Sequence, residues 1–365
     1  MRPRVKPALR RILRDDRTLQ YGVHPRRAVV LSELAPEVRR WIDGLDGTRD
    51  LRQVVRAAAR AGLDESGAHS LIDQLLERGV VDDATACPRV LSGLRLGERD
   101  RLRPELDALA VASRGADGGR DRFARRRRAQ VRVYGAGRVG AQVVALLAAS
   151  GVGSLSVADP GLATPADLVP GGLGWSEEGA SRAEGAVAVA RRAGPVHAWV
   201  AGSHLSDGSP LPDLVVLAPV GPLDLLLVRE LAGVGVPHLL AAAFEGYGTA
   251  GPLVIPGETA CLSCLDLFRR DHDPGWPLLT ARLGGYPPGE VACSAALATM
   301  VAASAAGHAL AFLDGDASLV TNGTMDVMPD WRCMRRSVGV HEQCRCFRND
   351  RASLTMVGSA REGLT

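Results

Sequence analysis

The sequence is poor in aromatic residues, because Phe, Trp and Tyr together make up only 4% of its 365 residues. Hydrophobic residues nevertheless make up 46%, so a substantial core must be built mainly from Ala, Val and Leu. The formal net charge is only +3, which favours neither nucleic acid nor an anionic membrane as a partner. A chain of this length predicts two domains.

Targeting and membrane signals are also missing. Residues 1–14 are basic but contain no apolar segment, so the sequence predicts no signal peptide. The apolar stretch from Leu297 to Leu313 contains His308 and many small residues, which favours a buried helix over a membrane span. We therefore expect a cytoplasmic protein with no membrane partner, in which close cysteine pairs bind metal more often than they form disulfides.

Several catalytic signatures are absent. The histidines form no H-x-x-x-H pair, and there is no nucleophile elbow, no Walker A lysine and no nucleic-acid recognition motif. We interpret His204, His238 and His308 as structural. The run Arg125–Arg128 just before a strand is interpreted as the solvated end of a linker.

The first 85 residues predict a winged-helix-like module. Residues 17–31 indicate a hairpin, and apolar spacing predicts helices over 34–45, 51–61 and 64–78. Val80-Val81 is expected to return as a wing strand. The third helix contains four acidic residues against Arg78 alone, which argues against reading DNA. Residues 86–128 are expected to be a linker, with a helix at 102–112 and an exposed stretch at 115–122.

From residue 129 onward the pattern alternates strands and helices, which predicts parallel pairing in an α/β, Rossmann-type doubly wound domain over 129–350. The turn Gly135-Ala-Gly-Arg-Val-Gly140 lies between a predicted strand and a helix, and Asp159 ends the next strand. Gly135 would permit the tight turn, Gly137 the approach of a phosphate, and Gly140 the packing of helix on strand. Asp159 would accept hydrogen bonds from ribose hydroxyls. Residues 351–365 are expected to be a flexible tail.

Two cysteine pairs predict a structural zinc site. Cys261 and Cys264 form a C-x-x-C motif, and Cys344 and Cys346 form a C-x-C motif more than 80 residues later. Four thiolates complete a tetrahedral site that leaves no position for water. Because C-x-C is a tight chelate, His341 or Cys333 remains an alternative fourth ligand. Cys87 and Cys293 are interpreted as small buried residues, since Cys293 has no evident activating base.

Together, the glycine turn, the acid after the second strand and the distant cysteine pairs resemble the ThiF/MoeB/ubiquitin-activating superfamily, over about 220 residues. Those enzymes adenylate the C-terminal glycine of a small protein. The N-terminal module resembles the PqqD-like winged helix that recognises leader peptides. The combination is similar to the leader-binding component of thiazole/oxazole-forming cyclodehydratases, which presents a precursor peptide to a separate YcaO-type enzyme that uses ATP.

The sequence departs from the adenylating members of the superfamily at several positions. The resemblance places Gly161 at the second acid of the Asp-x-Asp motif, Asp167 at the Asn, and Pro170 at the Arg that grips the phosphates. Val220 stands near the position of an acid that helps to bind Mg²⁺, and Arg182 is the nearest match to a lysine. Triphosphate chemistry needs cationic groups and Mg²⁺, so these departures predict inefficient adenylation.

Two functions remain open on the sequence alone. In the first, the chain is a leader-peptide-binding scaffold with structural zinc and a degenerate adenylation site. In the second, it is an active adenylyltransferase whose missing cations come from Arg138 in the glycine turn, from Arg125–Arg128 or from a partner subunit, since this superfamily often forms homodimers. ATP binding is left open by both.

Overall fold

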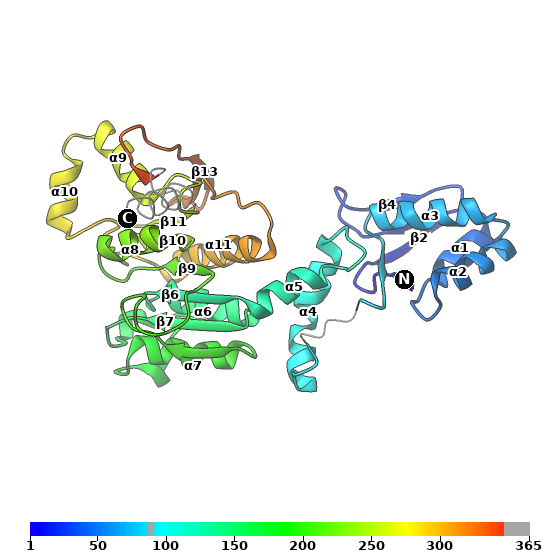
Figure 1. The fold of residues 1–365 in the computed structure, drawn as a ribbon, viewed down its shortest axis with the longest axis horizontal. Coiled ribbons are helices and arrows are strands. Elements are labelled where there is room, and N and C mark those ends of the chain that lie inside the picture. The colour runs from blue at the N-terminus through cyan, green and yellow to red at the C-terminus, as the bar shows by residue number, and fades with distance from the viewer. Residues whose placement is uncertain (87–90, 347–365) are drawn as a thin grey trace, which may run out of the picture. The chain divides into compact units, whose positions relative to one another are not determined.

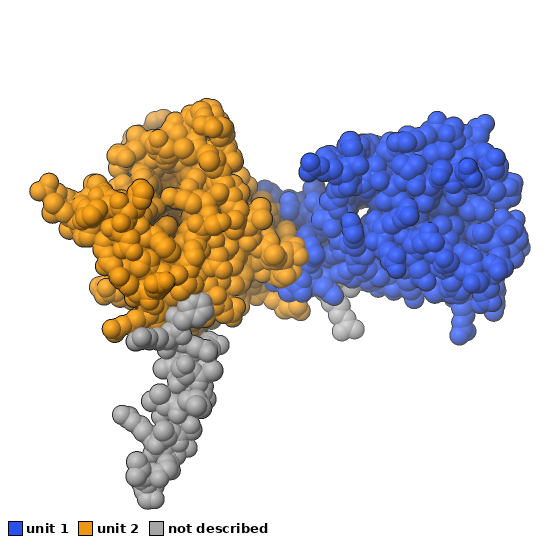
Figure 2. Space-filling model, turned by 90° about the horizontal axis from the view of Figure 1, so that it is seen from above, with its two compact units in different colours: residues 1–125 blue, residues 126–365 orange. Residues whose placement is uncertain are grey.

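The computed structural model describes residues 1–86 and 91–346, which form two compact units, Met1–Arg125 and Arg126–Thr365 as far as they are described (Figure 1, Figure 2). The expected tail at 351–365 and Cys87 lie outside the described residues.

The first unit contains two small sheets and a group of helices. Strand β1 (Pro3–Val5) pairs antiparallel with β5 (Val81–Asp83), and β2 (Arg11–Asp15), β3 (Thr18–Tyr21) and β4 (Val29–Leu31) form a second antiparallel sheet in that order. The expected hairpin is therefore present as β3–β4. The strand expected at Val80-Val81 is present as β5 but pairs with β1.

Helices of the first unit cover its apolar core. They are α1 (Pro36–Asp43), α2 (Leu51–Ala58), the 3-10 turn η1 (Ala59–Ala61) and α3 (Glu65–Glu77), whereas α4 (Leu96–Ala112) buries Leu102 and Leu109 in a separate cluster with Phe123. Asp50 and Asp64 cap the first turns of α2 and α3 through their carboxylates. Trp41 and Ile72 are buried in this core, and the Trp41 indole donates to the Val54 carbonyl oxygen at 2.9 Å. The apolar spacing in residues 34–78 thus predicted α1, α2 and α3 correctly.

The segment expected as a linker is more ordered than its composition indicated. Helix α4 begins six residues before the expected start, and a further helix, α5 (Arg120–Arg128), covers the arginine run. The interpretation of that run as solvated is wrong for Arg126, which is buried and forms a two-point ion pair with Asp314 at 2.6 and 2.7 Å. A guanidinium fork matched to a carboxylate outweighs the preference of an isolated arginine for water.

The second unit is an eight-stranded sheet with helices on both faces (Figure 1). The strand order is β13-β12-β11-β10-β9-β6-β7-β8. Its strands are β6 (Gln130–Tyr134), β7 (Ser154–Ala158), β8 (His197–Val200), β9 (Leu214–Leu217), β10 (His238–Phe244), β11 (Tyr247–Val254), β12 (Gly323–Val327) and β13 (Cys333–Ser337). Strands β6 to β10 are parallel, and β11 to β13 extend the sheet antiparallel.

Alternating residues of the sheet bury two separate cores. Val131, Val133 and Val216 pack with α6 (Gly140–Ala149), α7 (Arg182–Ala193) and α11 (Ala295–Asp314). Val215 and Leu240 face the opposite core, which includes α8 (Leu225–Val234) and α9 (Leu262–His272). Helix α10 (Trp276–Leu283) follows α9 and has no buried residue. This arrangement confirms the doubly wound α/β fold.

One helix in the described part of the chain, α11, is long and apolar enough to cross a membrane. Its buried residues belong to the core beside the sheet, where it contacts β10, β11 and α6. It is accounted for as a core helix, as expected from the sequence.

Candidate functional site

The glycine turn lies where the order of the parallel strands reverses. Strand β6 is flanked by β7 on one side and β9 on the other, and the turn leads from its carboxyl end into α6. In open α/β sheets this switch point is where ligands bind. Gly135 has φ +89°, and a Cβ there would lie 1.8 Å from the Ala218 carbonyl oxygen. Only glycine fits at this position.

The other two glycines of the turn permit equally close approaches. A Cβ on Gly140 would lie 2.0 Å from the carbonyl oxygen of Gly135, so the start of α6 can pack directly against the turn. A Cβ on Gly137 would lie 2.6 Å from Oε2 of Glu290. The space that the missing side chain of Gly137 leaves for a phosphate is thus taken by a carboxylate of the same chain.

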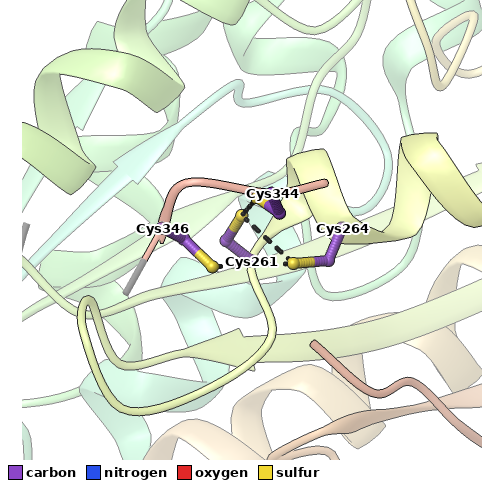
Figure 3. A group of neighbouring side chains, drawn as sticks. All are labelled: Cys261, Cys264, Cys344 and Cys346. Atoms are coloured by element: carbon purple, nitrogen blue, oxygen red, sulfur yellow. Dashed lines mark hydrogen bonds between the residues drawn. The ribbon is translucent and has the colours of Figure 1, made fainter. Parts of the chain in front are cut away.

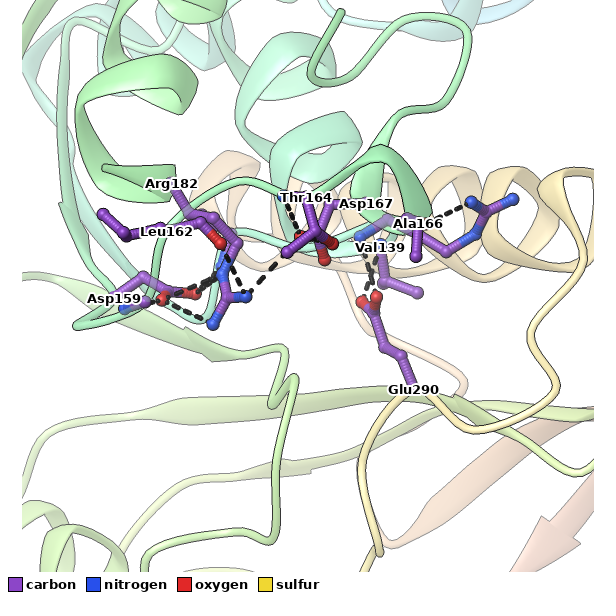
Figure 4. Close-up of polar contacts among 11 residues, drawn as sticks. Val139, Asp159, Leu162, Thr164, Ala166, Asp167, Arg182 and Glu290 are labelled. Atoms are coloured by element: carbon purple, nitrogen blue, oxygen red, sulfur yellow. Dashed lines mark hydrogen bonds and ion pairs between the residues drawn. The ribbon is translucent and has the colours of Figure 1, made fainter. Parts of the chain in front are cut away.

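Glu290 occupies the amino end of α6 (Figure 4). Its two carboxylate oxygens accept hydrogen bonds from the backbone N–H groups of Arg138 at 2.8 Å and of Val139 at 2.9 Å. These are the free N–H groups that make a helix amino end an anion site. Burial raises the pKa of the Glu290 carboxyl, although the two N–H donors act in the opposite direction.

Asp159 is engaged by the chain itself. Its carboxylate accepts the backbone N–H groups of Ala136 at 2.7 Å and Gly161 at 2.8 Å, and it forms an ion pair with Arg182 at 3.0 Å (Figure 4). The side chain of Asp159 is only 2% exposed. Its acceptor positions face internal donors rather than an open ribose site.

Arg182 fills the position that the resemblance gives to a second acid. A Cβ on Gly161 would lie 2.1 Å from the Arg182 guanidinium. The same guanidinium approaches Asp167 at 3.6 Å, and Asp167 also accepts the backbone N–H and the hydroxyl of Thr164, both at 2.8 Å. The cation therefore neutralises two acids instead of facing a phosphate.

Arg138, Pro170 and Val220, the other residues that the sequence placed near a nucleotide, present no free cation or acid to the glycine turn. The Arg138 guanidinium donates to the carbonyl oxygens of Ala166 at 2.6 Å and Leu168 at 3.2 Å. Pro170 is exposed, and Val220 lies beside Gly137, with its carbonyl oxygen accepting from the Glu290 N–H at 3.2 Å. The structure thus brings the predicted nucleotide-site residues together, but their polar groups are largely paired with one another.

The four cysteines expected to bind zinc also come together (Figure 3). The sulfur atoms of Cys261, Cys264, Cys344 and Cys346 all lie within 4.8 Å of one another, and three of the pairs are 3.6 to 3.8 Å apart. Zinc–sulfur bonds of about 2.3 Å in a tetrahedron place the sulfurs roughly 3.8 Å apart. The cluster could therefore bind one zinc ion.

The alternative ligands are not part of the cluster. His341 accepts the Gln343 N–H at 3.1 Å through Nδ1 and contacts the Asp271 carboxylate at 2.8 Å through Nε2. Cys333 is exposed on β13. Cys261 immediately precedes α9 and Cys264 lies in its first turn, so the cluster joins the start of this helix to the segment after β13. Such a donor set fits a structural role rather than catalysis.

Other residues weighed from the sequence lie outside both sites or lack activation. Cys293 is partly buried, and burial raises its pKa to about 11, which disfavours a thiolate nucleophile. His238 is fully buried, which lowers its pKa to about 4, and its Nδ1 lies 3.0 Å from the Val236 carbonyl oxygen. His308 lies 3.1 Å from the Ser318 hydroxyl, and His204 is largely exposed.

Sequence reasoning missed Glu290 and an aromatic cluster around Arg269. The acid precedes α11 in a Pro- and Gly-rich stretch, and nothing local marks it as a partner of residues about 150 positions away. The sequence did contain a sign of the aromatic cluster, because Phe268, Trp276 and Tyr286 lie within 20 residues of one another in a sequence that is poor in aromatic residues.

The second unit is a doubly wound, Rossmann-type α/β domain with a parallel half and an antiparallel extension, an arrangement that fits a ThiF-like fold. No protein-family model and no curated protein sequence matches the chain. Among solved structures, Escherichia coli MccB with ATP is similar over 95% of this chain and 99% of its own, with a TM-score of 0.70 and 16% identity.

Two further structures show the same likeness. The microcin C7 biosynthetic enzyme MccB in complex with N-formylated MccA has a TM-score of 0.71 at 15% identity, covering 95% of this chain and all of that one. PaaA has a TM-score of 0.65 at 15% identity, covering 92% and 99%. At these identities the comparisons show a shared fold.

Proposed function

We propose that this chain is a leader-peptide-binding scaffold of ribosomal peptide maturation. Its first unit would capture the leader as a PqqD-like winged-helix module, and its ThiF-like domain would present the peptide to a separate YcaO-type enzyme that uses ATP. Zinc has a structural role in this proposal. The adenylation site is degenerate, and the chain needs no bound ATP of its own.

One observation carries the proposal. Glu290 accepts the N–H groups at the amino end of α6, where a nucleotide would place its phosphates. A second carboxylate, that of Asp159, is paired with Arg182 and is therefore not free to bind a ribose. An incoming triphosphate must displace Glu290 and then meet no free cation from Arg182, so tight binding is disfavoured.

Peptide capture is supported by the exposed edge of the first unit's second sheet. Strand β2 is an edge strand whose five residues are all exposed, and Ile12 and Leu13 are 37% and 48% exposed. An extended peptide adds to such an edge through main-chain hydrogen bonds, with side-chain pockets giving specificity. The opposite edge, β4, offers a second position next to the hairpin.

The likeness to MccB supports a role in peptide maturation, since one of the similar structures is a microcin C7 biosynthetic enzyme with MccA bound. That likeness covers nearly the whole chain, including the first unit. The same likeness favours the second candidate function, adenylation of a peptide or protein carboxylate, because another similar structure holds ATP. For this activity Glu290 would have to leave the glycine turn, and Arg138 or a partner subunit would have to supply the cations.

ATP–pyrophosphate exchange separates the two functions. We expect the purified full chain to show no exchange above background, with or without peptides encoded by neighbouring genes. Strong, peptide-dependent exchange by the chain alone would rule out the scaffold and establish the adenylyltransferase.

Leader capture needs a separate experiment. Fluorescence anisotropy with labelled precursor peptides should detect binding by the full chain, and Leu13→Asp on β2 should weaken it about tenfold or more by placing a charge in the apolar contact. Leu96→Asp is the matched control, because Leu96 is 76% exposed on α4, outside the sheet that contains β2. If both variants bind like the wild type, the β2 edge is not the leader site.

A further inference from the structure

A cavity of about 930 Å³ in the second unit lies outside the glycine turn and the cysteine cluster. Its walls come from the β10–β11 turn, α9, α10, the segment before α11, and β12 and β13. Five aromatic residues line it: Phe244, Tyr247, Phe268, Trp276 and Tyr286. The whole sequence has only fourteen Phe, Trp and Tyr residues, so this concentration is not explained by composition.

The cavity also contains a cation without an acidic partner. The Arg269 guanidinium lies 3.8 Å from the ring centroid of Tyr286 and 5.2 Å from that of Trp276. Within residues 1–86 and 91–346, no carboxylate forms an ion pair with it. Burial lowers the pKa of Arg269, as expected for a guanidinium held away from water.

The acids around Arg269 are already engaged. Asp326 pairs with Arg336 at 3.0 Å and accepts the Thr249 hydroxyl at 2.8 Å. Asp273 accepts the Gly275 N–H at 2.9 Å, and Asp266 accepts the Trp276 indole N–H at 2.7 Å. These acids are therefore bonded to other groups, so the Arg269 guanidinium is hydrogen-bonded to the Tyr286 side chain but has no carboxylate in an ion pair within the described residues.

Stacking on aromatic rings prepares a guanidinium for one kind of ligand. The Trp276 and Tyr286 centroids are only 4.9 Å apart, with the rings inclined at 63°, so both rings lie on one side of the Arg269 guanidinium and leave part of its planar fork for hydrogen bonds. Such a fork binds a carboxylate through two parallel hydrogen bonds. The surrounding rings offer apolar contact for a side chain next to the carboxylate, and the volume is in the range of sites that take ligands larger than a single side chain.

We propose that this cavity binds the C-terminal end of a peptide, with the terminal carboxylate on Arg269 and apolar side chains against the aromatic wall. The inference rests on the proposed role in handling a peptide, and it assigns the second unit a contact separate from leader capture. A terminal carboxylate on Arg269 places the last side chain of the peptide next to the aromatic wall, and an internal acidic side chain is the alternative that the experiment below distinguishes. The ligand would be held by its end, whatever its internal sequence.

The cysteine cluster positions this cavity. Cys261 immediately precedes helix α9 and Cys264 lies in its first turn, and the same helix contains Phe268 and Arg269. A second segment, from Val338 to Cys344, also connects the cavity wall to the cysteine cluster. Within it, the His341 ring packs edge-on against the Phe268 ring, with 4.7 Å between the ring centroids. A metal bound by the four sulfurs would hold both walls at a fixed separation.

Two probes that differ only at their terminus test the proposal. N-acetyl-Leu-Phe is titrated into the full chain as the free acid and as the amide, and binding is followed by ligand-observed NMR. The wild type should prefer the acid by about tenfold, the usual value of a hydrogen bond to a charged group. Arg269→Met should remove this preference and leave amide binding unchanged.

Arg270→Met is the matched control, because Arg270 is the next residue of α9 and donates to Gln343 at 2.6 Å instead of lining the cavity. It should keep the preference for the acid. Equal binding of acid and amide by the wild type overturns the proposal, as does an unchanged preference in Arg269→Met. An amidated probe with an internal Glu that binds more tightly than the free acid would assign the site to acidic side chains instead.

A folding control and the leader-binding experiment distinguish failure of this inference from failure of the proposed function. Should Arg269→Met lower the thermal midpoint, Arg269→Lys provides a second variant, which keeps the charge, loses the planar fork and should give an intermediate preference. If the chain binds no leader peptide but still prefers the acid probe, only the proposed leader-binding function is rejected. If the chain binds the leader peptide but shows no preference for the acid probe, only the binding of a terminal carboxylate by Arg269 is rejected.

Discussion

The cysteine cluster and the glycine turn are both built from segments far apart in the sequence, yet they differ in what their ligand groups do. Four sulfurs converge at spacings suited to one metal ion, with His341 outside the set. At the glycine turn, the groups that would bind a nucleotide are paired within the chain, by Glu290 and Arg182. One site is arranged for a ligand from outside, and the other is internally satisfied.

The largest expected effect is on the cysteine cluster. Cys261→Ser or Cys346→Ser should release the metal and lower the free energy of unfolding by a few kcal/mol, since metal affinity is coupled to folding. Metal content by mass spectrometry and a thermal melt measure both effects. Cys333→Ser is the control, because Cys333 is exposed and outside the cluster. Wild-type protein purified without metal and with unchanged stability after chelation would contradict this view of the cluster.

The next effect concerns the internal ion pair at the glycine turn. Arg182→Met leaves the buried Asp159 carboxylate without its cation and should cost about 3 kcal/mol. In a domain of this size that lowers the melting midpoint by roughly 6–12 °C. Arg192→Met removes an ion pair of similar length, but Arg192 is 57% exposed, so it should cost less than about 1 kcal/mol. Equal losses in the two variants would show that Asp159 is not held by Arg182.

A third experiment opens the turn to anions. Glu290→Ala frees the N–H groups of Arg138 and Val139, and ATP affinity measured by calorimetry should rise by about tenfold. A thermal melt of the variant shows whether the fold is kept without the carboxylate that accepts these two N–H groups. Glu178→Ala, at an exposed position, is the control. Wild-type protein that already binds ATP as tightly as the variant would mean that Glu290 does not compete with it.

The smallest effect is the pH dependence of the same carboxyl. Burial raises the pKa of Glu290 above its ordinary value of about 4.5. A group with a raised folded-state pKa stabilises the fold most below its unfolded pKa and loses this contribution as pH rises through the folded value. Glu290→Gln cannot lose a proton, so its stability relative to the wild type should increase from about pH 4 to pH 8. Denaturant unfolding across this range measures the difference, and a change of the opposite sign would mean that the N–H donors dominate.

Local motifs made much of this comparison predictable from sequence. The spacing of Gly135, Gly137 and Gly140 placed the turn, because only a residue without Cβ fits such approaches. The four cysteines were found since two close pairs have few other uses in a reducing compartment. The doubly wound α/β fold followed from the alternation of strands and helices.

What the sequence did not predict depends on distant pairing. Nothing near Glu290 marks it as the partner of α6, since that contact depends on the path of the segment before α11. Arg126 was interpreted as solvated because its neighbours are arginines, and its partner Asp314 lies 188 positions away. The short β1 and β2 strands have too few apolar residues to show an alternating pattern.

The carboxylate of Glu290 also has a consequence for regulation. A domain of this fold that exchanges ATP and its products changes its occupancy with the energy state of the cell. Where the chain supplies its own anion in their place, the glycine turn of the proposed scaffold would stay occupied whatever the energy state of the cell. Its availability would then be set by its own abundance and by the supply of zinc, rather than by nucleotide concentration.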